Sequence, residues 1–431
     1  MADQTLLRQV LSMIMGVINP ATLAEATRVL TENRENPVFL EYLAEVYSGS
    51  TLDVPAAHVL DVRRIAGATL KASLLRVIYS MDGAGLQRVQ ARILTTLPDP
   101  ALAGVSATLV STLCKELNLL AQDQYESSPE GLPEPTLESL WPGLAGALVG
   151  VMEGAARGGG AGGLAAARGA ILAIKQLAED GCLYEGSTPT PATPAAHFLP
   201  RLLQWMTCSD GEVRLAAAQA GQAILYEVPE AAEPCLPAYL STLAAMHTAA
   251  SAHPPSAPAT TTVILHTFDN LVTGLPQAMW PHLPAIMPYV LGALGGGREG
   301  GECGRAAGAC LAGLVSQARD TDAEAGVVLF NPATQQLDPA AFRSSPGRGA
   351  VFPYLGAIFT ALLGGLPLAS EELARMPVRE GGTGQEGAAR GSGSDSHAHA
   401  AFAAAAKGLA GRGGRGGGGG GGCWRQPGGG Q

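Results

Sequence analysis

Cysteine and histidine are the residues of this chain that could bind a metal ion or act as nucleophiles, and neither type is grouped for such chemistry. The seven cysteines are scattered and form no CxxC pair. The eight histidines form no HExxH motif and have no cysteine partner at ligand spacing. Zinc sites need closely spaced ligands, and an odd number of scattered cysteines does not indicate a disulfide framework. We therefore expect no metal site and no disulfide-stabilised fold.

Motifs for nucleotide binding and for acyl transfer are also missing. The sequence has no GxxxxGK[ST] phosphate loop, and no strand-like pattern precedes its glycine-rich runs, as a dinucleotide-binding turn would require. It has no GxSxG nucleophile elbow. We expect no catalytic residues, no cofactor and no enzymatic activity.

The charge balance indicates protein partners. The 431 residues include 27 Lys and Arg and 37 Asp and Glu, a formal net charge of −10. An acidic chain disfavours non-specific binding to nucleic acid or to anionic membranes and suits a basic partner. Arg412 and Arg415 form an RGG-like segment, but no interleaved Phe or Tyr is present to stack on RNA. We expect no direct contact with nucleic acid.

Two apolar segments have features of a membrane span or a secretion signal. The uncharged stretch 349–370 is interrupted by prolines and glycines, which predicts a buried helix and no membrane contact. The N-terminal residues lack a basic region followed by a small-residue cleavage site, which is not typical of a signal peptide. We expect a helix there as well.

Helical spacing of apolar residues dominates the first 320 residues. Apolar side chains recur every three or four positions in 59–77 and 102–120, and no comparable strand-like alternation occurs. Clusters of Pro, Gly, Asp and Ser interrupt this pattern about every 15 to 25 residues, which favours short helices that lie antiparallel to their neighbours. The sequence predicts an all-α chain.

Two signals repeat with a period of about 40 to 47 residues. One is an aromatic residue or Leu followed by Pro, as at Trp141-Pro142 and Trp280-Pro281. The other is an arginine followed by small residues, as at Arg64 and Arg168. Two helices per unit at this period are typical of HEAT repeats, whose pairs cover their apolar faces by stacking. The predicted fold is an all-α HEAT-repeat α-solenoid, or α-α superhelix, with a disordered Gly-rich C-terminal tail.

We predict three regions. Residues 1–318 form an array of about seven helix pairs, 319–379 hold an insertion and a degraded eighth repeat opening at Phe352, and 380–431 form a low-complexity disordered tail. The polyglycine and alanine runs of that tail cannot bury a core. The internal segments 158–163 and 295–301 are expected to be flexible loops between helices.

The recurring arginines and tryptophans have a structural interpretation beside a binding one. Arginines on the second helix of a pair often tie neighbouring repeats together, and we favour this for Arg64, Arg168 and Arg214. Tryptophans are more often core residues between stacked helices than platforms for a ligand, and we favour this for Trp141, Trp205 and Trp280.

A series of short motifs follows in order along the first 300 residues. The residues NPVFLEYL at 36–43 and RIAGATLK at 64–71 are followed by VSATLVSTL at 105–113 and WPGL at 141–144. In kind and order they resemble the N-terminal half of the importin-β (karyopherin-β) family, with 1–80 similar to its N-terminal region. DGEVR at 210–214 and LPAIMP at 283–288 look like the transportin subfamily. The resemblance covers about 1–318. We therefore expect the chain to be either a truncated paralogue of the family or the product of a faulty gene model.

The resemblance implies a nuclear import receptor without enzymatic activity. Members of this family bind the small GTPase Ran in its GTP form through inner helices of the first repeats, and Phe-Gly nucleoporins through outer helices of middle repeats. Their cargo proteins carry basic localisation signals, and the receptors shuttle between cytoplasm and nucleus through the nuclear pore. Carried over to this chain, Asp61, Arg64 and Lys71 are the candidate Ran face. The alternative is a HEAT-repeat scaffold subunit of another multiprotein complex, such as a phosphatase.

Overall fold

All regular structure in the described part of the chain is helical. The computed structural model describes residues 4–49, 53–127, 135–158, 160–183, 193–251, 257–295, 301–329 and 338–364. Every element in these ranges is an α-helix or a short 3-10 helix. The chain divides into two compact units, residues 1–310 and 311–431. The all-α HEAT-repeat solenoid expected from the apolar spacing is confirmed, whereas the division at 318 and 379 stays a prediction and the tail 380–431 lies outside the described residues.

The helices come in pairs. The first helices of the pairs are α1 (Gln4–Ile18), α3 (Pro37–Ser48), α5 (Gly83–Thr96), α8 (Leu144–Gly158), α10 (Pro194–Met206), α12 (Leu236–Ser251) and α15 (Leu283–Gly295). The second helices are α2 (Leu23–Glu32), α4 (Val59–Val77), α6 (Ala103–Ser127), α9 (Gly160–Glu179), α11 (Gly211–Glu227), α13 (Ala257–Gly274) and α16 (Glu302–Glu324). Short helices join them: η1 (Ala56–His58), η2 (Ile78–Ser80), α7 (Leu137–Leu140), η3 (Pro229–Cys235), α14 (Pro276–Met279) and η4 (Trp280–His282).

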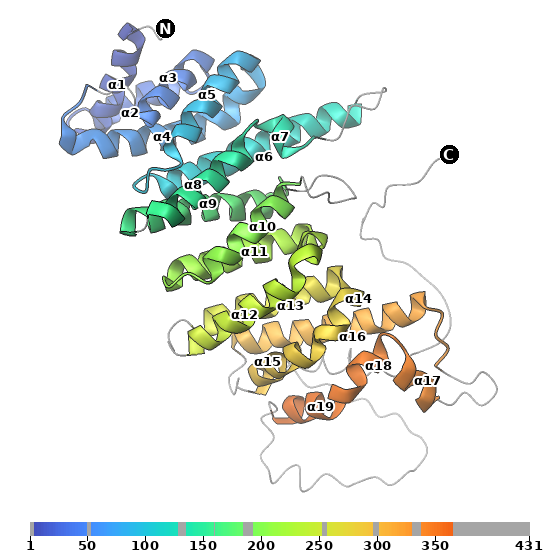
Figure 1. The fold of residues 1–431 in the computed structure, drawn as a ribbon. Coiled ribbons are helices and arrows are strands. Elements are labelled where there is room, and N and C mark those ends of the chain that lie inside the picture. The colour runs from blue at the N-terminus through green and yellow to red at the C-terminus, as the bar shows by residue number, and fades with distance from the viewer. Residues whose placement is uncertain are drawn as a thin grey trace, which may run out of the picture. The chain divides into compact units, whose positions relative to one another are not determined.

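Within the first unit the pairs stack in two layers (Figure 1). The second helices α4, α6, α9, α11 and α13 contact one another in chain order, and the first helices do so from α1 to α3 to α5 and from α8 to α10 to α12. In the first six pairs each helix also packs on its own partner, as α8 does on α9. This is the nearest-neighbour arrangement of a repeat array.

Local sequence signals set the ends of several helices. Asn36 accepts a hydrogen bond from the backbone N–H of Val38 and is followed by Pro37, so α3 begins there. Asp210 caps α11 in the same way through the N–H groups of Glu212 and Val213. Gly49 ends α3 with a φ of +72°, a conformation that costs glycine little. These caps make the connections between helices short.

The core lies between the two layers. Leu40 on α3, Leu70 on α4 and Leu109 on α6 are each fully buried. Burying one such side chain contributes about 1.5–3 kcal/mol. Small residues bring the second helices close together, since a Cβ on Gly169 would lie 2.5 Å from the Cβ of Ala103. Each pair thus buries its apolar face against its neighbours.

The segment 158–163 differs from the loop that its glycines predict. Residue 158 ends α8 and residue 160 begins α9, so the helices occupy almost the whole segment. Gly160 makes the turn with a φ of +73°, and a Cβ on Gly163 would lie 3.1 Å from the carbonyl oxygen of Ala155. The glycines therefore serve a tight turn and close helix packing. In the other predicted loop, residues 296–300 lie outside the described ranges.

The second unit contains the last turns of α16 and the helices α17 (Pro339–Ser344), α18 (Arg348–Val351), η5 (Phe352–Tyr354) and α19 (Leu355–Gly364). Asp322 on α16 is 1% exposed and accepts hydrogen bonds from the backbone N–H groups of Gly347, at 2.7 Å, and Arg348, at 3.2 Å. It also pairs with the Arg348 guanidinium at 3.2 Å. This buried carboxylate holds the turn before α18 against α16. η5 begins at Phe352 and leads into α19, and the assignment of these helices to a degraded eighth repeat stays a prediction.

Candidate partner-binding surfaces

The three residues of the predicted Ran face lie on one side of α4. Asp61, Arg64 and Lys71 are all exposed, and their spacing of three and seven residues places them along one stripe of the helix. The opposite side of α4 is buried, with Val62, Ala66 and Leu70 in the core. We call Asp61, Arg64 and Lys71 the α4 stripe. The helix brings them together, and their role stays a prediction.

The charges of the α4 stripe are free of ion pairs. Neither Asp61 nor Lys71 has a salt bridge or a side-chain hydrogen bond among the described residues, and Arg64 makes one long contact, 3.4 Å from Nη2 to the carbonyl oxygen of Ala101. Two cations and one anion give this surface a charge of 2 − 1 = +1. The stripe is therefore locally basic although the chain is acidic, and it suits an acidic surface on a partner.

Arg63 is a structural residue that the sequence motif did not single out. Its guanidinium pairs with Asp99 at 2.6 Å, and its Nε donates to the carbonyl oxygen of Tyr47 at 2.9 Å. The Arg63 side chain is only 16% exposed, in contrast to its exposed neighbour Arg64. Arg63 therefore links the second pair of helices to the third. Its adjacent position and identical charge left no sequence signal to separate it from Arg64.

Two other arginines have different roles. Arg168 on α9 pairs with Glu212 on α11, so it ties neighbouring repeats as the sequence predicts. Arg214 instead donates from Nη1 to the carbonyl oxygen of Cys208 at 2.9 Å, within its own pair, so the prediction is wrong for this residue. The Asp210-Gly211 cap turns the chain back sharply, which brings the Cys208 carbonyl within reach of the first turn of α11.

Further polar links join the second-helix layer. Lys115 on α6 pairs at 2.9 Å with Asp180, just after α9, and Ser111 donates to the same carboxylate. Asn270 on α13 donates to the carbonyl oxygen of Gln222 on α11 at 3.1 Å. Lys115, Ser111 and Asn270 are thus engaged between repeats. The α4 stripe differs because its Lys71 and Asp61 have no such neighbour among the described residues.

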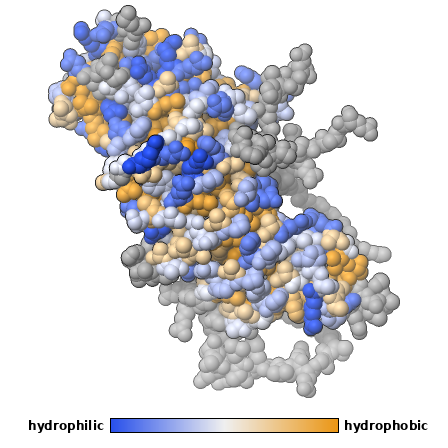
Figure 2. All heavy atoms as spheres, in the orientation of Figure 1, coloured by the Kyte–Doolittle hydropathy of each residue, from blue (hydrophilic) through white to orange (hydrophobic). Residues whose placement is uncertain are grey.

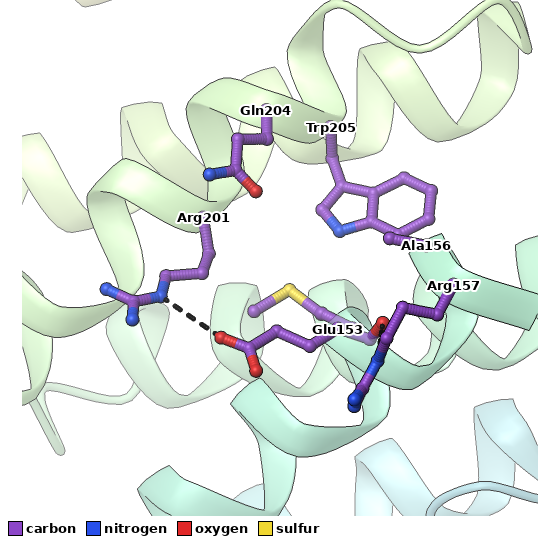
Figure 3. A pocket seen from close by; sticks show the side chains of 7 residues that line it. Glu153, Ala156, Arg157, Arg201, Gln204 and Trp205 are labelled. Carbon is purple, nitrogen blue, oxygen red and sulfur yellow. Dashed lines mark hydrogen bonds and ion pairs between the residues drawn. The ribbon is translucent and has the colours of Figure 1, made fainter.

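A groove lies between the first helices α8 and α10 (Figure 3). It has a volume of about 360 Å³ and is lined by Met152, Glu153, Ala156, Arg157, Arg201, Gln204 and Trp205. Figure 3 shows the Trp205 indole reaching from α10 toward Ala156 on α8, with the Arg201–Glu153 ion pair, 3.7 Å long, at the other side. An apolar floor with a charged rim can accept an aromatic or aliphatic side chain.

The three predicted core tryptophans are placed differently. Trp141 is 1% exposed and belongs to the core. Trp205 is 8% exposed, yet the side of its ring that remains accessible lines the groove. Trp280 is half-buried. The core interpretation is confirmed for Trp141, whereas Trp205 both packs between helices and forms part of a surface site.

The described residues offer no assembled site for metal or thiol chemistry. No group of three or more His, Cys, Asp or Glu side chains there could hold a metal ion. Burial raises the pKa of the Cys182 thiol to about 12, with the nearby Asp180 carboxylate adding to the effect, and burial raises the pKa of Cys114 as well. A raised pKa keeps a thiol protonated and unreactive. None of the helices in the described ranges combines the length and the apolar run needed to span a bilayer.

The surface carries polar and apolar side chains side by side. Figure 2 shows blue, hydrophilic residues interspersed with orange, hydrophobic ones over the face that it presents. The stacked helix pairs define an α-solenoid of the HEAT-repeat class.

Comparison with known proteins identifies the kind of solenoid. No family model matches the sequence, and no curated protein matches it. A structure of Kap95p, whose binding induces the switch loops of RanGDP to adopt the GTP-bound conformation, has a TM-score of 0.53 at 14% identity and covers 94% of this chain. Kap121p bound to the SUMO protease Ulp1p has a TM-score of 0.51 at 14% identity, and Kap121p bound to Nup53p a TM-score of 0.50 at 13% identity. Each covers 94% of this chain.

The protein therefore has the fold of the importin-β, or karyopherin, structures, and the predicted family resemblance is confirmed at the level of fold. At 13 to 14% sequence identity, this similarity shows the fold alone. The match extends over 42% of the Kap95p chain and 37% of the Kap121p chain, so this chain spans about two fifths of the length of the structures that it matches.

Proposed function

We propose that the protein is a nuclear import receptor-like protein that binds Ran in its GTP form and Phe-Gly nucleoporins and supports nucleocytoplasmic protein transport. It acts by binding and not by catalysis, shuttles between cytoplasm and nucleus, and carries cargo with basic localisation signals. The observation that carries this proposal is the karyopherin fold over 94% of the chain. Two of the similar structures are described together with partners of these kinds, a form of Ran and the protein Nup53p.

The α4 stripe is the proposed contact for Ran. Arg64 and Lys71 are exposed on a second helix near the N-terminus and are not neutralised by a carboxylate among the described residues. Free cations do not need to break an existing ion pair before they bind an acidic surface. Their contribution to binding is therefore not reduced by the free energy of breaking such a pair. Asp61 lies on the same stripe and adds a negative charge, which can set the orientation of the bound partner.

Binding to Ran tests the function directly. The full-length protein, immobilised, is expected to retain Ran loaded with a non-hydrolysable GTP analogue and to bind Ran-GDP more weakly. Arg64→Glu and Lys71→Glu are each expected to reduce the affinity for the GTP form by about tenfold, because they reverse a charge in the contact. Isothermal titration calorimetry measures this change.

A matched charge reversal at Arg8 serves as the control. Arg8 is exposed on α1, forms no ion pair among the described residues and lies outside the stripe. Arg8→Glu is expected to leave Ran binding unchanged. Equal binding of the two nucleotide forms by a folded protein would contradict the proposed function and favour a HEAT-repeat scaffold for another complex. If the protein preferred Ran-GTP but neither Arg64→Glu nor Lys71→Glu changed the affinity, the proposed function would stand and the Ran contact would lie outside the α4 stripe.

The groove between α8 and α10 is the proposed site for a Phe-Gly segment. A phenylalanine ring fits an apolar floor made by Met152, Ala156 and Trp205, and glycine flanks let a peptide backbone approach the rim closely. The groove lies between first helices of adjacent repeats in the middle of the first unit. The family resemblance implies that outer helices of middle repeats bind such segments, and we assign this role to α8 and α10.

A further inference from the structure

The groove between α8 and α10 differs in charge from the chain as a whole. Its charged lining residues are two arginines, Arg157 and Arg201, and one glutamate, Glu153, so positive charge is in excess there. The whole chain carries a formal charge of −10. The groove therefore favours a ligand charge of the sign that the molecule as a whole repels.

Arg157 presents an available guanidinium at one side of the groove. The residue is exposed and lies near the C-terminal end of α8. Its Nε donates to the backbone carbonyl oxygen of Glu153 at 3.2 Å, which restrains the side chain. Its two Nη atoms have no carboxylate partner among the described residues. They keep the fork geometry that matches a carboxylate group.

Arg201 is only weakly neutralised. Its Nε lies 3.7 Å from Oε1 of Glu153, whereas a charge-assisted hydrogen bond is about 2.7–2.9 Å long. The side chains of this pair are 33% and 50% exposed, so water screens their attraction. Figure 3 shows Arg201 and Arg157 on opposite sides of Glu153. One carboxylate cannot neutralise two guanidinium groups, so positive charge is left for a ligand.

The positive charge borders an apolar floor. Met152 is buried and Trp205 is 8% exposed, and both line the groove. Arg157 directly follows Ala156, which faces the indole on α8. Arg201 lies four residues, about one helical turn, before Trp205 on α10. A ligand that places an aromatic ring on this floor therefore brings its neighbouring residues toward the two arginines.

We infer that the groove selects Phe-Gly segments in which aspartate or glutamate flanks the phenylalanine. The inference rests on the proposed function in taking a Phe-Gly segment as the occupant, and it adds the sequence class that the groove prefers. The phenylalanine ring covers the apolar floor, while the flanking carboxylates pair with Arg157 and Arg201. Lysine at the same positions meets two like charges. Selectivity thus comes from attraction and from repulsion together.

Three peptides that differ only beside the phenylalanine test this selectivity. Each holds one Phe-Gly pair in a frame of glycine and serine, flanked on both sides by Asp, by Asn or by Lys, and each carries the same fluorescent label. Fluorescence anisotropy with the full-length protein is expected to rank the affinities as Asp above Asn above Lys. The gain from Asn to Asp is expected to be about fivefold, and to shrink as salt is added.

The net charge of −10 works against this order, because it attracts the Lys peptide and repels the Asp peptide. A preference for the Asp peptide therefore reports the groove and not the overall field. We call the affinity for the Asp peptide divided by that for the Asn peptide the acidic preference.

Two substitutions in the groove shift the acidic preference in opposite directions. Arg157→Gln removes an unpaired cation and is expected to lower it toward one. Glu153→Gln removes the carboxylate of the groove, leaves Arg201 unpaired, and is expected to raise it by about threefold. Arg8→Gln on α1 and Glu126→Gln on α6 are the matched controls. Both residues are exposed, outside the groove and without an ion pair among the described residues, and the acidic preference is expected to stay the same.

An acidic preference of one or below would overturn the inference, as would one that neither groove substitution changes. An equal rise in Glu153→Gln and Glu126→Gln would reduce the effect to net charge and overturn it too. If the Asn peptide still bound in these cases, the groove would remain a Phe-Gly site. If none of the three peptides bound, the inference and the assignment of the groove would both fail. Ran binding is measured without peptide and is decided separately.

Discussion

At the scale of single residues, position around a helix decides the role of a charge. Arg63 and Arg64 are adjacent and chemically identical, but successive residues of an α-helix point about 100° apart. One guanidinium therefore enters the junction between repeats and meets Asp99, while the other remains at the surface. Sequence periodicity alone places Arg64 outside the core. It does not reveal the ion pair of Arg63, because its partner Asp99 lies 36 residues away in the chain.

Close approach of helices makes Gly67 a critical residue. A Cβ there would lie 2.6 Å from Cγ1 of Val105 and 2.8 Å from Cε2 of Tyr47. Tyr47 cannot move freely, since it is fully buried and its hydroxyl is hydrogen-bonded to Ser106 at 2.6 Å. Gly67→Ala is expected to destabilise the first unit by about 1–3 kcal/mol. Urea unfolding followed by circular dichroism measures this as a lower midpoint.

Gly150→Ala is the matched control for this substitution. Gly150 lies inside α8, is exposed, and a Cβ there would meet no atom within 4 Å. The change is expected to stabilise the helix by about 0.5–1 kcal/mol, because alanine loses less backbone entropy than glycine. If both substitutions raised the midpoint, the tight contact at Gly67 would not govern stability.

At the scale of elements, surface sites arise where neighbouring helices of one layer meet. The groove exists because α8 and α10 pack side by side with Trp205 between them and small Ala156 opposite. Neither helix alone would form a hollow. A similar meeting of η2 and α6 lets the Tyr79 hydroxyl donate to Oε2 of Glu116 at 3.4 Å. Both surfaces combine residues from different repeats.

Filling the groove tests its proposed use. Ala156 is exposed and lines the groove, so Ala156→Gln adds a longer neutral side chain without removing a core contact. Binding of a Phe-Gly peptide is expected to weaken by about tenfold, since an aromatic anchor in a pocket usually provides much of the binding energy. Surface plasmon resonance with the full-length protein provides the measurement.

Ala245→Gln is the control for the groove. Ala245 is an exposed position of α12, away from the residues that line the groove. This variant is expected to bind the peptide as the unaltered protein does. Undiminished binding by Ala156→Gln would remove the groove from the proposed function and leave the Ran contact as it stands.

At the scale of the whole molecule, stability in a repeat array is local, because each pair contacts mainly its neighbours. The two compact units should therefore respond separately to damage. Nearest-neighbour packing also lets a solenoid bend at a small cost in free energy.

The buried Asp322–Arg348 pair allows this separation to be measured. Asp322→Asn leaves the Arg348 side chain, only 8% exposed, without its counter-charge, and its Nε already has no hydrogen-bond partner. Breaking such a pair costs about 3–5 kcal/mol. Hydrogen exchange is expected to accelerate in 338–364 and to stay unchanged in helices α1 to α11.

Asp320→Asn gives the comparison for this effect. Asp320 pairs with Arg319 at 2.9 Å, and both side chains are about half exposed, at 45% and 52%. Loss of an exposed pair costs less than about 1 kcal/mol, so exchange should change little. Faster exchange throughout the first unit in Asp322→Asn would contradict local stability.

Much of the fold followed from the sequence, because helix formation, caps and repeat period are encoded by residues close together in the chain. The spacing of apolar residues identified the helices, and signals such as Asn36-Pro37 identified their starts. The glycines at 158–163 were misinterpreted because composition alone does not distinguish a flexible loop from close helix packing. Arg214 was misplaced for a related reason, since its partner is a backbone carbonyl with no sequence signature.

The sequence by itself thus determined the helical class, the pairing of helices and the exposed stripe of Asp61, Arg64 and Lys71, since all of these depend on local periodicity. The tertiary structure alone decided which charges are already engaged, as Arg168 is with Glu212, and which remain free, as Lys71 does among the described residues. It also decided that Trp205 borders a groove. The physical reason is that ion pairs and grooves join residues tens of positions apart, whose distance is fixed only when the repeats stack.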